Sequence, residues 1–219
     1  MKEKPILFNG DMVRAVLDGS KTQTRRIVKP QPWRFCPSNT PRDSFDMPIK
    51  CPYGVTGDRL WVRETHAITE HGSWTKCNKP IQSYTAINER GRRQVLNKWN
   101  LIYRATQTID PDYPVRWRPS IHMPRWASRI TLEVVSVKVE RVKGITYDDA
   151  IAEGLYREWD GTKHWYGEHS EVSGLTPYPT VAFQNLWDSI NGKPRKNGAD
   201  ISWYANPWVW VVEFKLEDK

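Results

Sequence analysis

Residues 128–139, SRITLEVVSVKV, carry the clearest structural pattern in the chain. Polar and apolar side chains alternate along most of this stretch, as they do in a β-strand with one buried face. Residues 208–214, WVWVVEF, predict a second, buried strand. Residues 148–154 and 181–190 lie between these two strands and indicate short helices. The first of these has Thr146 as its N-cap, acidic residues in its first turn and Gly154 at its end. The second half of the chain therefore predicts strands joined by short helices.

The first half of the chain predicts further elements of the same kinds. Residues 5–8 and 59–65 have the patterns of strands, and residues 11–18 have an apolar face at helical spacing that ends at Gly19. Irregular stretches rich in proline, turn-forming or polar residues interrupt these elements, at about residues 29–57, 66–120 and 155–180. We expect an α+β or mostly-β fold in a single domain over residues 1–219, a small barrel with short helices and these stretches as insertions.

The composition is that of a folded, basic protein. The chain has 219 residues, of which 26% are charged and 38% hydrophobic, and it contains twelve Trp, nine Tyr and five Phe. Aromatic side chains bury large areas, so this content supports a compact core and excludes a disordered chain. The formal net charge of +8 attracts polyanions at long range, which favours a nucleic-acid or nucleotide partner.

Neither a membrane helix nor a secretory signal is predicted. No window approaches the roughly 18 apolar residues that a membrane helix needs, and the apolar stretch near the N-terminus is too short for a signal. The three cysteines cannot all pair with one another, which fits a reducing compartment. We expect a cytoplasmic monomer with no membrane partner.

The densest polar cluster follows the first predicted helix, at residues 21–26, KTQTRR. An amine such as Lys21 acts as the base for a nearby hydroxyl such as Thr24 if neighbouring cations depress the pKa of the amine. Arg25 and Arg26 are candidates for that repulsion, and also for binding phosphate. The alternative interpretation is a solvated loop, whose cations complement the end of the helix dipole.

Glu153 stands near the end of the predicted helix 148–154, just before Gly154. The helix dipole disfavours a carboxylate at this end, so the residue is an unusual choice. One interpretation makes Glu153 an acid, a base or a group that orients water. The other makes it an exposed glutamate on a turn.

A metal site is a further hypothesis for the cysteines. Cys36, Cys51 and Cys77, with His66 and His71 nearby, have the residue types of a zinc site with three cysteines and one histidine. Their spacings lack the close cysteine pairs that make such a site specific. We expect no metal and no other cofactor.

Tryptophans flanked by arginines suggest a surface on which a nucleic-acid base stacks. The tryptophans are Trp61, Trp117 and Trp126, and the arginines are Arg59, Arg63, Arg116, Arg118 and Arg125. The alternative places Trp61 and Trp126 in the core. Pro119 and Pro124 stiffen the chain before Trp126, which lowers the entropy lost when this stretch holds a contact.

These motifs, taken in order, resemble those of ASCH domains, which have a PUA-like β-barrel. Residues 19–26, GSKTQTRR, match the family signature Gly-x-Lys-Thr-x-x-x-Arg. Residues 57–62 are similar to the family's Gly-Asp turn and the strand after it. Residues 150–154, AIAEG, are similar to its Ala-x-x-Glu-Gly helix, and residues 208–214 to its closing strand. The motifs cover about half of the chain.

The resemblance implies an activity. Small bacterial ASCH proteins include metal-independent amidohydrolases that release acetate from N4-acetylcytidine with a Lys, a Thr and a Glu, and these match Lys21, Thr24 and Glu153. In one assignment Thr24 attacks the amide carbonyl and Lys21 takes its proton; in another, Glu153 activates water directly. Other members of the family are RNA-binding modules or ribonucleases, so an RNA-binding module in which Lys21, Arg25 and Arg26 hold phosphates is the alternative function, followed by a ribonuclease.

The insertions have no counterpart in the small amidohydrolases. Residues 51–54, CPYG, and 122–126, HMPRW, are similar to the longer phage and prophage members of the family. We expect residues 122–126 to fold over the barrel mouth and contact the substrate, a modified nucleoside or RNA. The predicted substrate-binding residues are Arg25, Arg26, Trp61, Arg63, Glu64, His122, Arg125 and Trp126.

Overall fold

A computed structural model describes residues 1–32, 34–35, 40–69, 84–87, 93–96, 100–106, 116–162, 164–167, 175–192 and 200–217 of the chain. The chain divides into two compact units. The first unit contains Met1–Lys4, Ala15–Leu60 and Thr131–Lys219, and the second contains Pro5–Arg14 and Trp61–Ile130. The interpretation of residues 1–219 as a single domain stays a prediction.

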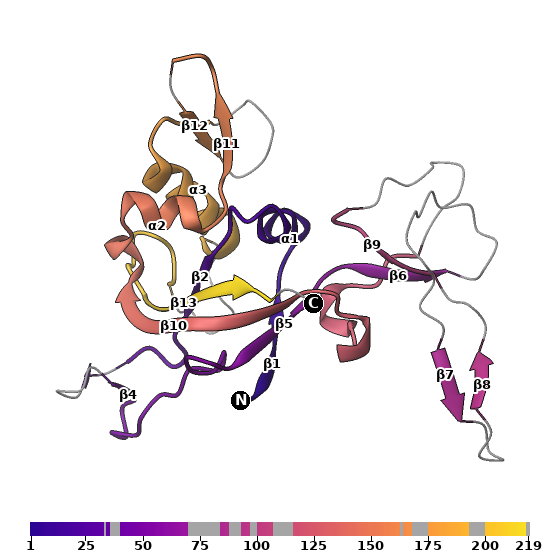
Figure 1. The fold of residues 1–219 in the computed structure, drawn as a ribbon. Coiled ribbons are helices and arrows are strands. Elements are labelled where there is room, and N and C mark those ends of the chain that lie inside the picture. Colours follow the sequence, from indigo (N-terminus) through magenta and orange to yellow (C-terminus); the bar gives the residue numbers. More distant parts are fainter. Residues whose placement is uncertain are drawn as a thin grey trace. The chain divides into compact units, whose positions relative to one another are not determined.

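Five strands form one mixed sheet (Figure 1). Their order in the sheet is β1 (Glu3–Leu7), β5 (Arg59–Arg63), β10 (Thr131–Arg141), β13 (Trp208–Leu216) and β2 (Gln23–Ile27). β13 is antiparallel to both of its neighbours, β10 and β2. β1 runs parallel to β5, since the Arg59 N–H donates to the Lys2 carbonyl and the Phe8 N–H donates to the Arg63 carbonyl.

The predicted α+β class with mostly strands is confirmed, but the described strands do not close the predicted barrel. β1 and β2 are the edges of the sheet, and no pairing between them is present among the described residues. The strand predicted at residues 59–65 is confirmed as β5, in which Leu60 and Val62 are buried and the residues beside them half-buried. The strand predicted at residues 128–139 begins three residues later, as β10.

The first predicted helix is confirmed as α1 (Gly10–Leu17). It begins after Asn9, whose side-chain oxygen accepts a hydrogen bond from the Met12 N–H at 2.8 Å, as an N-cap residue does. Gly19 follows the helix with a φ of +82°, the left-handed conformation in which glycine is favoured.

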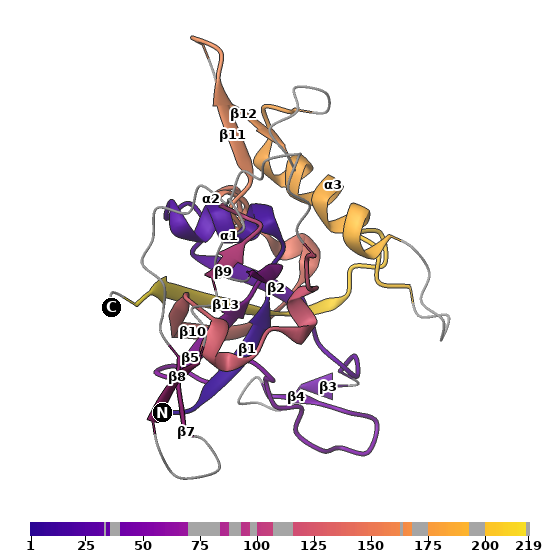
Figure 2. The same cartoon turned by 90° about the vertical axis from the view of Figure 1, so that its right-hand side faces the viewer.

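Two further helices pack together on one face of the sheet in the first unit (Figure 2). α2 (Tyr147–Ala152) begins with a capping box, in which Thr146 and Asp149 accept each other's backbone N–H groups. α3 (Pro179–Asn191) begins with a proline, whose fixed φ suits the first turn of a helix. Apolar side chains of both helices and of β13 form one buried cluster, which includes Ala150, Ala182, Phe183, Trp187, Val209 and Val211.

One of the irregular stretches contains short strands that the sequence pattern missed. Residues 155–180 contain an antiparallel hairpin of β11 (Tyr156–Trp159) and β12 (His164–Gly167), where we expected no regular element. Strands of four residues are too short to establish a period of two, so their pattern is lost among turn-forming residues. The Tyr166 side chain joins the buried cluster of α2 and α3.

The remaining elements are equally short. The other paired strands are β3 (Arg34–Phe35) with β4 (Pro41–Arg42), β6 (His66–Thr69) with β9 (Asn100–Tyr103), and β7 (Tyr84–Ile87) with β8 (Arg93–Leu96). The 3-10 helices are η1 (Ser120–His122), η2 (Arg125–Ala127) and η3 (Val142–Gly144). In the parts of the chain that the structure describes, no helix has the length and apolar character needed to cross a membrane.

Candidate functional site

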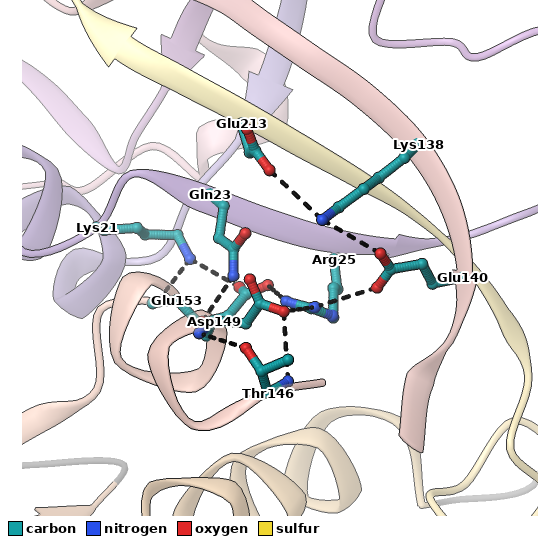
Figure 3. Close-up of polar contacts among 9 residues, drawn as sticks. All are labelled: Lys21, Gln23, Arg25, Lys138, Glu140, Thr146, Asp149, Glu153 and Glu213. Atoms are coloured by element: carbon teal, nitrogen blue, oxygen red, sulfur yellow. Dashed lines mark hydrogen bonds and ion pairs between the residues drawn. The ribbon is translucent and has the colours of Figure 1, made fainter. Parts of the chain in front are cut away.

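The chain brings Lys21 and Glu153 into direct contact, although 131 residues lie between them (Figure 3). Lys21 Nζ lies 3.1 Å from Glu153 Oε2 and 2.6 Å from the Glu153 carbonyl oxygen. Both residues are buried, with exposed fractions of 3% for Lys21 and 5% for Glu153. The interpretations of residues 21–26 as a solvated loop and of Glu153 as an exposed glutamate are therefore wrong.

Backbone contacts fix this pair in place. Lys21 and Glu153 form an isolated antiparallel bridge, and the Thr22 N–H donates to the Ala152 carbonyl at 2.9 Å. The Lys21 N–H donates to the carbonyl of Ala15 in α1 at 2.8 Å. Because Lys21 precedes β2 and Glu153 is the C-cap of α2, the ends of two elements position the two side chains.

Gly154 allows α2 to approach Lys21. Its φ is +78°, and a Cβ atom at this position would lie 2.7 Å from Lys21 Cβ and 2.8 Å from Ala15 Cβ. Those separations are shorter than van der Waals contact, so both the backbone angle and the space require glycine. The Glu-Gly pair of the predicted motif thus has a structural reason: the glutamate reaches Lys21 only because the next residue has no side chain.

Arg25 is the second cation that holds Glu153. Its side chain is completely buried, and Arg25 Nη1 lies 3.2 Å from Glu153 Oε1. Arg25 Nη2 lies 3.0 Å from Asp149 Oδ2 and 3.4 Å from Glu140 Oε2. The guanidinium therefore joins a residue of α2, its C-cap and a residue of β10 (Figure 3). We expected Arg25 to bind substrate or phosphate, but among the described residues its guanidinium pairs with carboxylates of this chain and lies over the Phe183 ring.

Burial is the main cause that lowers the pKa of Lys21 below that of an ordinary lysine. The Glu153 carboxylate opposes this through its charge and its hydrogen bond, while the charges of Arg26 and Arg25 lower the pKa further. The two arginines act in the expected direction, but they contribute less than burial does. An amine with a lowered pKa is neutral more often near physiological pH and so is able to accept a proton.

Three polar residues around the pair were not predicted from the sequence as part of the site. Gln23 Nε2 donates to the Asp149 carbonyl at 2.7 Å, and Asp149 and Glu140 are the further partners of Arg25. Burial alone would raise the pKa of Asp149, but hydrogen bonds from Thr146 and the charge of Arg25 outweigh it and lower that pKa. The sequence does contain a pattern that indicates the position of Asp149. Asp149 is the third residue after Thr146, where a capping box needs a carboxylate.

Strand alternation separates Thr24 from Arg25. In the β2–β13 pairing, Arg25 lies opposite Val211, which belongs to the cluster under α2 and α3, whereas Thr24 lies opposite Val212. The Thr24 side chain therefore points to the other face of the sheet from Arg25. Thr24 is buried, and among the described residues no hydrogen bond joins its side chain to Lys21 or Glu153.

Arg26 lies on the same side of β2 as Thr24 by the same alternation. Burial lowers the pKa of Arg26, against the attraction of Tyr53 and Glu153. Arg26 is thus close enough to the Lys21–Glu153 pair to influence it electrostatically, as the lowered pKa of Lys21 also indicates.

The other predicted substrate-binding residues belong to the second unit: Trp61, Arg63, Glu64, His122, Arg125 and Trp126. Glu64 is buried, and its carboxylate forms two hydrogen bonds with Arg129, of 2.8 and 2.9 Å. Trp126 is 48% exposed, so its interpretation as a core residue is wrong. Trp61 is half-buried and lies beside the guanidinium groups of Arg63 and Arg125. The expected lid formed by residues 122–126 stays a prediction.

The zinc hypothesis falls largely outside the described residues, because these exclude Cys36, Cys77 and His71. Cys51 is a free cysteine, and burial raises the pKa of its thiol. His66 is completely buried, and burial lowers its pKa. Within the described ranges, no group of three or more His, Cys, Asp or Glu side chains is placed to hold a metal ion.

Comparison with known proteins adds no relative, because no family model, no curated protein and no solved structure matches this chain.

Proposed function

We propose that this protein is an ASCH-type amidohydrolase with a PUA-like fold, which removes the acyl group from an N-acylated pyrimidine nucleoside or base such as N4-acetylcytidine. The motifs of residues 19–26 and 150–154 support the family assignment, because they contribute Lys21 and Glu153 to one buried contact. The observation that carries the proposal is that contact: an amine whose pKa burial lowers lies 3.1 Å from a carboxylate.

The proposed reaction needs a base, Lys21, and a second residue, Glu153, that orients this base. Neutral Lys21 Nζ takes a proton from water as the water oxygen bonds to the amide carbonyl carbon. When the tetrahedral intermediate collapses, the bond from this carbon to the exocyclic nitrogen breaks, and the Lys21 ammonium returns the proton to that nitrogen. The products are a carboxylic acid and the free amine of the base. Glu153 orients Lys21 and accepts a hydrogen bond from the N–H group of the substrate amide.

The contacts favour water over Thr24 as the nucleophile. Lys21 and Glu153 contact each other, and Arg25 is the second partner of Glu153. The Thr24 side chain lies on the opposite face of β2 from Arg25. A Thr24→Val substitution separates the two routes, since it keeps the shape of the side chain and removes the hydroxyl. The water route predicts that this variant keeps most of its activity. An acyl group found on Thr24 by mass spectrometry would instead support the threonine route.

Arg25 is a positioning residue in this proposal. It holds Glu153 Oε1 while Lys21 holds Oε2, so the carboxylate is fixed at both oxygens. Arg25 is in turn fixed by Asp149 and Glu140. Two cations at one carboxylate leave Lys21 less strongly paired than in a simple ion pair, which favours the neutral amine.

The test is to incubate the purified protein with N4-acetylcytidine and to follow cytidine release by chromatography. Lys21→Met and Glu153→Gln are each expected to lower kcat/KM by at least about 100-fold, the scale of general acid–base catalysis. Lys215→Met and Glu133→Gln are matched controls, because this pair is also joined at 3.0 Å but is solvent-exposed. The controls should keep wild-type activity. Activity that survives both Lys21→Met and Glu153→Gln would contradict the proposal.

A further inference from the structure

The segment of the second unit that contains the 3-10 helices η1 and η2 has apolar and cationic side chains exposed to solvent. Trp126 is 48% exposed and Ile121 is 55% exposed, and His122 and Arg125 are exposed beside them. Exposed apolar side chains that share one short segment, unlike those scattered singly over a surface, are a feature of binding sites. We call this group the η1–η2 surface: Ile121, His122, Arg125 and Trp126 with the neighbouring Arg116 and Arg118.

The charged residues in and around the η1–η2 surface are mostly positive. Residues 116–130 contain four arginines and no acidic residue. In the described part of the second unit the acidic residues are Asp11 and Glu64, and each is already in an ion pair, with Arg14 and Arg129 respectively. Arg116, Arg118 and Arg125 are exposed. This surface therefore attracts a polyanion, and among the described residues of its unit little charge of the opposite sign offsets it.

Guanidinium groups also lie beside the indole rings. The Arg63 and Arg125 guanidinium carbons lie 5.5 and 5.9 Å from the centre of the Trp61 ring, and that of Arg104 lies 6.0 Å from the Trp117 ring. Planar cations and indoles in alternation give stacking positions for bases and charge for phosphates within one patch.

The patch is held in a fixed shape. Met123 and Ala127 are buried and anchor the segment, while Pro119 and Pro124 precede its two turns. Each proline carbonyl accepts a hydrogen bond three residues on, from the His122 N–H at 3.0 Å and the Ala127 N–H at 3.1 Å. Arg63 Nη2 donates to the Ile121 carbonyl, which ties β5 to η1. Little entropy is then lost when a ligand binds the exposed side chains.

We propose that the η1–η2 surface binds single-stranded nucleic acid. An unpaired base stacks on the exposed indole of Trp126, and Arg125, Arg118 and Arg116 contact the phosphates around it. A single strand is favoured over a duplex because the indole needs the free face of an unstacked base. The site lies wholly within the second unit and uses neither Lys21 nor Glu153, so this proposal does not rest on amide hydrolysis.

The test is fluorescence anisotropy with labelled 12-nucleotide probes, oligouridylate and oligodeoxythymidylate, beside a duplex of the same length. Inorganic polyphosphate as a competitor separates stacking from simple charge attraction. Both single strands are expected to bind more tightly than the duplex, and polyphosphate should compete poorly. The logarithm of affinity should fall with the logarithm of salt concentration, with a slope of about −0.7 for each phosphate contact.

The variants distinguish this surface from the rest of the basic protein. Trp126→Ala is expected to weaken binding by roughly tenfold with little change in the salt slope, because stacking is lost. Arg118→Ala with Arg125→Ala is expected to reduce the slope by about 1.4, two contacts at 0.7 each. Trp159→Ala with Arg157→Ala is the matched control, because both residues are exposed on the β11–β12 hairpin of the first unit.

Circular dichroism and thermal unfolding check that each variant is folded; Arg118→Ala and Arg125→Ala made separately replace the double variant if it is not. Three results would overturn the proposal: no binding of either single strand at low salt, equal affinity for duplex and single strand, or losses in the β11–β12 control as large as those in the η1–η2 variants. Amidohydrolase activity is measured in the same preparations, so the two proposals fail separately.

Discussion

Lys21 occupies a place where its usual positive charge is unfavourable. It is buried against Glu153, and burial lowers its pKa more than the carboxylate raises it. The folded protein therefore releases a proton from Lys21 at a lower pH than the unfolded chain does. The same lowered pKa on which the proposed role of Lys21 as a base depends also makes stability depend on pH.

The first prediction follows from the sign of this shift. Between the lowered pKa of folded Lys21 and about 10.4, the pKa of a lysine in an unfolded chain, the unfolded state binds more protons. The free energy of unfolding should then rise with pH across this window. Lys21→Met removes the effect, so the wild type should gain stability relative to the variant as pH rises in urea titrations. A difference that shrinks with rising pH would contradict the lowered pKa.

The second prediction concerns Gly154. Gly154→Ala places a methyl group 2.7 Å from Lys21 Cβ in a left-handed backbone, so it should lower stability by more than about 2 kcal/mol and reduce activity. Gly19→Ala is the control: its φ is +82°, but nothing lies within 4 Å of the added carbon. That variant should lose only about 1 kcal/mol, the cost of the backbone angle. Equal losses in urea unfolding would mean that contact with Lys21 does not matter.

The sequence motifs indicated which residues to consider together, but not which further residues contact them. The motifs singled out Lys21 and Glu153, which do meet. Arg25 was expected to bind substrate. Side chains alternate between the two faces of β2, and Arg25 lies on the face where it contacts Glu153 and Asp149 instead. That outcome depends on which face of β2 the α2 helix covers, and such information is tertiary rather than local. Asp149 was noted as a charge in the first turn, but not as a partner of Arg25.

Among the elements, α2 has the most direct influence on the site. Six residues form it, too few for a helix to be stable alone, so caps and packing must hold it. The Thr146 hydroxyl accepts the Asp149 N–H at 3.2 Å, and Asp149 in turn binds Arg25. The cap at the start of the helix is thereby connected to Glu153 at its end.

The third prediction is that Thr146→Ala destabilises the protein by about 1 kcal/mol, the usual value of a lost N-cap. It should also lower kcat/KM, because Asp149 loses a partner that orients it toward Arg25. Thr146→Ser keeps the hydroxyl and should restore both properties. Thr162→Ala is a control on an exposed turn, where the hydroxyl bonds only Asp160 among described residues. Failure of Thr146→Ser to restore activity would contradict the role of the cap.

Elements with a clear sequence pattern were predicted well, including the short α2 and β5, and the four-residue strands β11 and β12 were not. α1, α3, β5, β10 and β13 were each expected within a few residues of their observed bounds. The β11–β12 hairpin was missed, because strands of four residues give no usable period. Tyr166 packs into the cluster of α2 and α3, so tertiary contacts rather than local pattern stabilise this hairpin.

At the scale of the whole molecule, the fourth prediction compares the loss of stability when a buried tryptophan, Trp187, and an exposed one, Trp126, are each replaced by alanine. Trp187 is 5% exposed in the cluster of α2, α3 and β13, and its Nε1 donates to the Ile201 carbonyl at 2.9 Å. Trp187→Ala should cost about 3–5 kcal/mol, as other large-to-small core substitutions do. Trp126→Ala, at an exposed position, should cost less than about 1 kcal/mol. Urea unfolding of both variants checks this, and similar losses would contradict the assignment of the core.

The class of the whole fold was predictable, but its closure was not. Alternating strands and short helices indicated an α+β protein with mostly strands. Whether a sheet closes depends on strand tilt and register, which no single strand carries in its sequence. The described strands leave β1 and β2 as edges.

The pH dependence of N4-acetylcytidine hydrolysis tests the central claim most directly. Wild-type kcat/KM should rise with pH through one ionisation, with an apparent pKa below that of an ordinary lysine, as Lys21 becomes neutral. Arg25→Gln should move this ionisation to higher pH, and Arg25→Lys, which keeps the charge, should move it less. A profile that neither arginine variant shifts, or one that Lys21→Met leaves unchanged, would contradict the claim that Lys21, held by Glu153, is the base.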